Sequence, residues 1–291
     1  MRQAHRSSTQ AAREKLHIEH CPIIADAEDA MVETCLKEPS ELDKLWAHYM
    51  LQGLIYIFLD DYNTEIFKTK RLLLPFIKTV ECSKSTYWAI VDITCGAYFN
   101  AAQMLRLILE TALQTVYITL EHPDSYQKQL SLAEKLEKGM QVAGKPVRSF
   151  GASIITELSR KHNWITTAEE KQLRNLWSKL SSLSHTSVKW IKKIRDLKRE
   201  KKVYFFTYDK KDFRAIATLF HQVMDINLAF QAQHFPKAVH TALKDPQATK
   251  HKAIQEIIGK LKLTPTILAK QTTSSQPPTA HQHTSASHNQ S

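Results

Sequence analysis

The chain has 291 residues, of which 43% are hydrophobic, and 40 Lys and Arg against 29 Asp and Glu give a net charge of +11. This length is enough for one generous hydrophobic core. Charged and amide side chains interrupt the longest apolar stretches, which excludes a membrane-spanning helix, and no secretory leader is recognisable. We therefore expect a cytoplasmic protein that makes no membrane contact.

The cysteines form no CxxC pair, which excludes a zinc ribbon and a thioredoxin-type motif. His17, His20 and Cys21 lie close together, but no second ligand cluster has the spacing of a zinc site. We expect reduced thiols, no metal and no cofactor. The four cysteines are Cys21, Cys35, Cys82 and Cys95.

The chain has only six glycines, and its apolar residues recur in runs longer than a strand. These features favour an all-α fold. In chain order the sequence predicts N-terminal helices at 11–20, 26–37, 40–62 and 66–80, the last kinked at Pro75. A long hydrophobic helix over about 86–121 follows, and we expect it to be the centre of a multi-helix bundle.

Further helices are predicted at 125–140, 147–162 and 167–183. A short strand or extended segment of β-branched and aromatic residues is predicted at 203–208. A helix that Asp209 or Asp212 caps should end near His234, where Phe235 and Pro236 follow. The last helix is expected at 247–263. We thus expect one helical domain over 1–263, with N-terminal helices in 11–82, a core in 86–236, and a disordered polar tail at 264–291.

A polar stripe runs along the predicted central helix and includes Arg106 and Glu110, which form an i,i+4 pair. It is either a solvated edge or structural ion pair, or a polar seam that faces a cleft. We expect His185, from the hydroxyl-rich segment 180–187, to join Arg106 and Glu110 if the seam binds a ligand. The other members of the stripe are Asp92, Gly96, Gln103 and Gln114.

The excess of positive charge is concentrated between Lys189 and Lys202, where eight basic residues face only Asp196 and Glu200. At helical spacing, one side of this run is apolar and the other is basic. Such a face is either solvated or tracks the phosphates of a nucleic acid. The candidate basic face consists of Lys192, Arg195, Arg199 and Lys202.

Three strings carry a family resemblance: 96–110 with its LRxxLE pattern, the His122-Pro123-Asp124 loop, and 176–185 with its LSSLSH sequence. Over 87–236 the chain resembles a family of archaeal helical proteins in which LRxxLE, HPD and LSxxxH recur. That family carries no established activity, so the resemblance implies only a helical fold.

More distantly, the helical layout is similar to HEPN-type domains, which often form dimers. Some branches of that family cleave RNA with an arginine and a histidine separated by four to six residues. Arg214 and His221 fit this spacing, as do Arg13 and His20. The resemblance therefore makes Arg214 and His221 candidate catalytic residues.

The sequence leaves open whether the chain is an enzyme. The leading hypothesis is a non-enzymatic helical module that forms a homo-oligomer and binds nucleic acid or a nucleoprotein through the basic face. The alternatives are a HEPN-like ribonuclease and a protein- or small-ligand-interaction domain that uses the polar seam.

Overall fold

The computed structural model describes residues 22–137, 150–184 and 206–260, and these residues are nearly all helical with no strand among them. The predicted all-α bundle is therefore confirmed. The predicted strand is not formed at residues 206–208, and the rest of it lies outside the described ranges. Among the described helices, none combines the length and the apolar character that a bilayer crossing needs.

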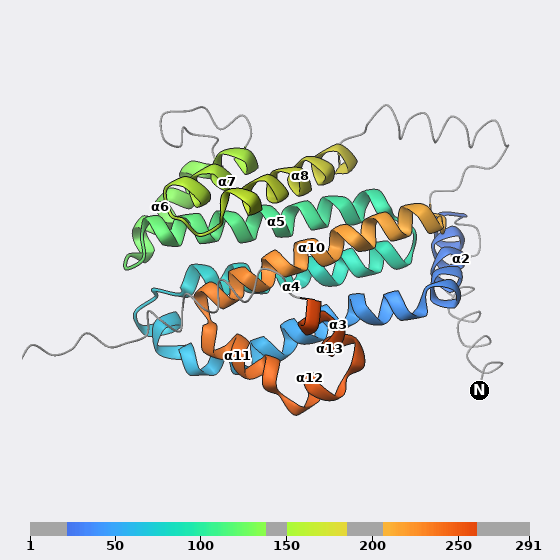
Figure 1. Ribbon diagram of the computed structural model, residues 1–291, viewed down its shortest axis with the longest axis horizontal. Helices are drawn as coiled ribbons and strands as arrows, with labels where there is room; N and C mark the ends of the chain where they lie inside the picture. Colours follow the sequence, from blue (N-terminus) through green and yellow to red (C-terminus); the bar gives the residue numbers. More distant parts are fainter. Residues whose placement is uncertain (1–21, 138–149, 185–205, 261–291) are drawn as a thin grey trace, which may run out of the picture.

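Helix α5 (Tyr98–Glu121) lies at the centre of the bundle, as the sequence predicts for this part of the hydrophobic stretch. Figure 1 shows α8 (Thr167–Ser184) on one side of it, and α4 (Leu73–Thr94) and α10 (Lys210–His234) on the other. Small and aliphatic side chains lie on most faces of α5, so that neighbouring helices can pack against it from several directions at once. Its fully buried residues include Ala101, Ala102, Leu105, Ile108, Leu109 and Ala112.

The predicted single helix over 86–121 is wrong, because α4 ends at Thr94 and the chain reverses into α5. Gly96 adopts a φ of 75° directly after the end of α4. The N–H of Ala97 donates to the carbonyl of Asp92 and that of Gly96 to the carbonyl of Ile93, which is the Schellman pattern of a helix end. The polar stripe is consequently broken, and Asp92 does not continue the line of Arg106.

Helix α4 also runs through the predicted boundary near residues 82–85. Pro75 lies in its first turn, where a missing N–H is tolerated, instead of kinking a helix at 66–80. Ser83 lies within α4, and its hydroxyl donates to Oε1 of Gln52 on α3 (Pro39–Ile57). The chain between α3 and α4 forms a 3-10 turn, η2 (Phe58–Tyr62), and a π turn, η3 (Thr64–Lys68).

Helix α10 is parallel to α5 and was predicted with nearly the correct bounds. The carboxylate of Asp209 accepts the N–H of Asp212 as an N-cap, and the N–H of Asp209 donates to the Tyr98 hydroxyl at the start of α5. At the other end, His234 contacts Thr119 over 2.8 Å. These contacts fix the position of α10 against α5.

The C-terminal part of the described chain differs from the prediction in two ways. Helix α10 ends at His234 as predicted, but an unpredicted helix, α11 (Pro236–Lys244), begins directly at Pro236, where proline suits the first helical turn. The predicted helix over 247–263 is two helices, α12 (Pro246–Lys250) and α13 (Lys252–Lys260), and the predicted helix 11–20 and the tail lie outside the described residues. The other elements are α2 (Pro22–Lys37), α6 (Tyr126–Glu137) and α7 (Phe150–Arg160).

Candidate functional site

A chain of hydrogen bonds joins two histidines and a carboxylate between α3 and α10. The Nε2–H of His221 donates to Oε1 of Glu41 over 2.7 Å, and Nδ1 of His221 lies 2.9 Å from Nε2 of His48. Glu41 and His48 are seven residues apart on α3, so two turns place them on the same face. The site therefore depends on the packing of α10 against α3.

The protonation of this cluster follows from its contacts. The hydrogen bond from His221 lowers the pKa of the Glu41 carboxyl to about 2, although burial opposes the shift. Burial lowers the pKa of His48 to about 3, so His48 is neutral at neutral pH. An ionised Glu41 holds the proton of His221 on Nε2, which leaves Nδ1 as an acceptor for the Nε2–H of His48. A carboxylate thus orients the His221 imidazole, and His48 contacts its second nitrogen.

The cluster lines a cavity of about 190 Å³ that also reaches α13. Lys44 lies 3.4 Å from Glu41 and 3.7 Å from Glu256, so one lysine faces two carboxylates. Asp225 of α10 adds a third acidic residue to the wall. The combination of a small acidic cavity and an oriented imidazole is suited to acid–base chemistry.

Of the two predicted catalytic residues, only His221 belongs to this cluster. Arg214 lies 3.6 Å from Glu38, at the start of α3, and its side chain is mostly exposed. The Glu38 carboxylate also accepts the hydroxyl of Tyr208 over 2.9 Å. Within the described part of the chain, no contact joins Arg214 to His221, although both face the beginning of α3.

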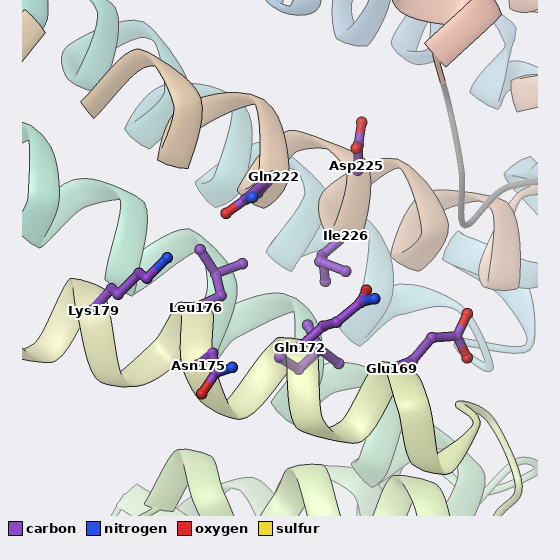
Figure 2. Close-up of a pocket in the computed structure, with 9 residues that line it drawn as sticks. Glu169, Gln172, Asn175, Leu176, Lys179, Gln222, Asp225 and Ile226 are labelled. Carbon is purple, nitrogen blue, oxygen red and sulfur yellow. The ribbon is translucent and has the colours of Figure 1, made fainter. Parts of the chain in front are cut away.

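A larger groove lies between α8 and α10, with a volume of about 540 Å³ (Figure 2). Three carboxamides line it, and none of them forms a hydrogen bond with another described residue. Asp225 belongs to this groove and to the histidine cavity, so the two hollows adjoin along α10. The apolar residues of the groove are Leu173, Leu176 and Ile226, and the carboxamides are Gln172, Asn175 and Gln222.

The polar seam joins α5 to α8. Nε of Arg106 donates to Oε1 of Glu110 over 2.9 Å, and the same oxygen accepts the indole N–H of Trp177 over 2.8 Å. The Arg106 guanidinium also lies over the Trp177 ring and 3.4 Å from the Ser184 hydroxyl. These contacts give the pair a structural role, while His185 lies outside the described residues.

We expect Arg106→Ala to lower the free energy of unfolding by about 2 kcal/mol, because it removes a charged hydrogen bond from Glu110. About a quarter of each side chain is exposed, so the cost stays below that of a fully buried pair. Urea denaturation followed by circular dichroism measures it. Adding Glu110→Gln should recover part of the loss, whereas a cost below about 0.5 kcal/mol would reduce the seam to an ordinary surface pair.

The predicted basic face lies outside the described residues, as does the whole of the positive charge excess. The undescribed segments hold 17 of the 40 Lys and Arg residues but only 4 of the 29 Asp and Glu residues. That leaves 23 basic and 25 acidic residues in the described helices, which are therefore close to neutral.

Sequence reasoning missed Glu41, His48, Trp177 and the groove between α8 and α10. A local signal existed only for the first two, as a glutamate and a histidine seven residues apart on one predicted helix. Among the described residues, no three His, Cys, Asp or Glu side chains are placed to hold a metal ion.

Comparisons with protein-family models, curated proteins and solved structures gave no match to the chain. The resemblance to the archaeal helical family and to HEPN-type domains stays a prediction. The same holds for the homo-oligomer and for the cytoplasmic location.

Proposed function

We propose that this protein is a helical module that associates with nucleic acid through its basic segments. The observation that carries the proposal is the separation of charge: the described helices are nearly neutral, while the run from Lys189 to Lys202 supplies eight basic and two acidic residues. A concentrated run attracts phosphates far more strongly than the same charge spread over a surface. The described residues lie on either side of that run in the sequence, up to Ser184 and from Phe206.

Binding to a labelled single-stranded RNA, measured by fluorescence anisotropy, should weaken steeply with salt because each phosphate contact releases counterions. Replacing Lys192, Arg195 and Arg199 with Gln should reduce the slope of log K against log salt by about 2, since each contact contributes about 0.7 on single strands.

The matched control carries the same change of charge on exposed lysines of the described helices. Lys128, Lys171 and Lys211 are replaced with Gln, and the slope should stay near that of the wild type. Equal effects of the two triple variants would mean that net charge alone, not the basic face, attracts the RNA. An absence of binding by the wild type at low salt would refute the proposal.

The second candidate function is a ribonuclease, and the cluster of Glu41, His221 and His48 favours it. Nδ1 of His221 can take the proton of a ribose 2′-hydroxyl, the step that RNA cleavage requires of a base, once that hydroxyl replaces the N–H of His48 as its hydrogen-bond donor. The groove of about 540 Å³ beside the cluster is large enough for a nucleotide. The anisotropy samples also test this idea: RNA shortened by the wild type but intact with His221→Ala would establish cleavage, and intact RNA in both would exclude it.

A further inference from the structure

A third cavity, of about 350 Å³, lies at the far end of the bundle from the start of α10. It is formed where α5, α6 and α10 meet the residues that precede α4. Pro123, from the His122-Pro123-Asp124 loop of the sequence, lines it together with Leu72 and Leu120. The cavity is separate from the histidine cluster and from the groove between α8 and α10, because it shares no lining residue with either.

One buried acceptor in this cavity has no hydrogen-bond donor within the described part of the chain. The side chain of Gln129 is 1% exposed, and its Nε2 donates to the carbonyl of His122 over 2.8 Å. That bond, with a longer one to the carbonyl of Arg71, fixes which end of the amide is the oxygen. Oε1 of Gln129 is buried and has no donor among the described residues. An unsatisfied buried acceptor costs about 1–3 kcal/mol, so an N–H or O–H donor from a ligand or an ordered water would stabilise this oxygen.

The other polar groups of the cavity favour an anion. The Tyr62 hydroxyl accepts the N–H of Lys237, which leaves its own proton to donate. Arg71 lines the cavity and forms no ion pair with a described residue. His234 adds no charge, because burial lowers its pKa to about 4. Its Nδ1–H donates to the carbonyl of Phe230, so Nε2 accepts the hydroxyl of Thr119.

We propose that this cavity binds a small organic acid with a hydrogen-bond donor next to its carboxylate, the chemistry shared by free amino acids and hydroxy acids. The donor meets Oε1 of Gln129, and the carboxylate meets the Arg71 guanidinium and the Tyr62 hydroxyl. Leu72 and Leu120 provide an apolar wall for the side chain of the ligand. The volume lies near the lower end of the range for ligand sites, which suits a metabolite of this size better than a nucleotide cofactor.

Saturation-transfer NMR on the full chain tests the proposal with L-leucine and with two analogues that each lack one of its charged groups. Isoamylamine lacks the carboxylate, and 4-methylpentanoate lacks the ammonium group. L-leucine should bind at least about tenfold more tightly than either analogue, because each analogue loses one charged hydrogen bond. The standard amino acids and L-lactate, each at ~10 mM, extend the search to weak binding.

Arg71→Gln should weaken the binding of the best ligand of this set by about tenfold or more. Because Arg71 is exposed, the substitution should leave the fold intact. Lys128→Gln is the matched control, because it removes one positive charge from α6 at a residue that does not line the cavity, and it should leave the affinity unchanged. Gln129→Met should also weaken binding, with circular dichroism as the check on folding. If no probe shows saturation transfer, or if Arg71→Gln and Lys128→Gln behave alike, water alone satisfies Gln129 and the proposal is wrong.

Discussion

Lowering the pH from about 8 to about 5 should remove about 4 kcal/mol of unfolding free energy through two buried histidines. Burial lowers the pKa of His48 to about 3 and that of His234 to about 4. An unfolded histidine has a pKa near 6.5, so below that value the unfolded chain takes up protons that the folded chain refuses. Each histidine therefore costs about 2 kcal/mol at pH ~5, and the loss continues until the pH reaches its folded pKa.

Two carboxyl groups modify this dependence. Burial raises the pKa of Asp92 to about 6, so the folded chain binds that proton first and gains some stability as the pH falls toward 4. Asp92 is partly exposed, and solvent screening keeps this gain smaller than the loss from the histidines. The low pKa of Glu41, about 2, contributes stability above its unfolded value of 4.5 that is lost as the pH falls through about 2.

Denaturation by urea at several pH values measures the effect. His48→Gln keeps a donor for Nδ1 of His221, and His234→Asn keeps a donor for the carbonyl of Phe230. Each variant should reduce the loss between pH ~7 and ~5 by about 2 kcal/mol. His240→Gln is the control, because His240 is exposed on α11 and its imidazole contacts water in both states. If both variants kept the wild-type dependence of unfolding free energy on pH, neither histidine would be held neutral in the folded chain.

The fold could be predicted where the signals are local. Helix α10 was placed almost correctly because Asp209 caps it and Phe235 and Pro236 mark its end. The break between α4 and α5 was missed because a single glycine within a hydrophobic run is compatible with a continuous helix. Only the approach of a segment more than a hundred residues later shows why the chain must turn at Gly96.

The candidate site could be predicted only in part for the same reason. His221 was singled out by its spacing from Arg214, but the structure places a different set of groups around it. Its partners Glu41 and His48 lie on α3, and no periodicity near residue 221 indicates which helix will pack there. The polar seam was easier to predict from the sequence, because Arg106 and Glu110 are one turn apart on the same helix. Its third member, Trp177, comes from a helix distant in the sequence and was missed.

Gly96→Ala should lower the free energy of unfolding by about 3 kcal/mol, for two independent reasons. Gly96 has a φ of 75°, a conformation that costs an L-residue about 1–2 kcal/mol. A Cβ at this position would also lie 2.5 Å from the carbonyl oxygen of Thr207 and 2.9 Å from its nitrogen. These are backbone atoms just before α10, so no side chain can rotate away, and overpacking of this kind costs about 1–3 kcal/mol.

The same substitution at Gly53 is the matched control and should have the opposite sign. Gly53 is exposed within α3, and a Cβ there would meet nothing within 4 Å. Alanine should therefore stabilise the helix by up to about 1 kcal/mol, because glycine loses more backbone entropy on folding. Urea denaturation of the two variants compares the signs directly. If Gly96→Ala were also neutral or stabilising, α4 would continue into α5 as one helix, and the Thr207 backbone would not lie against the turn that separates them.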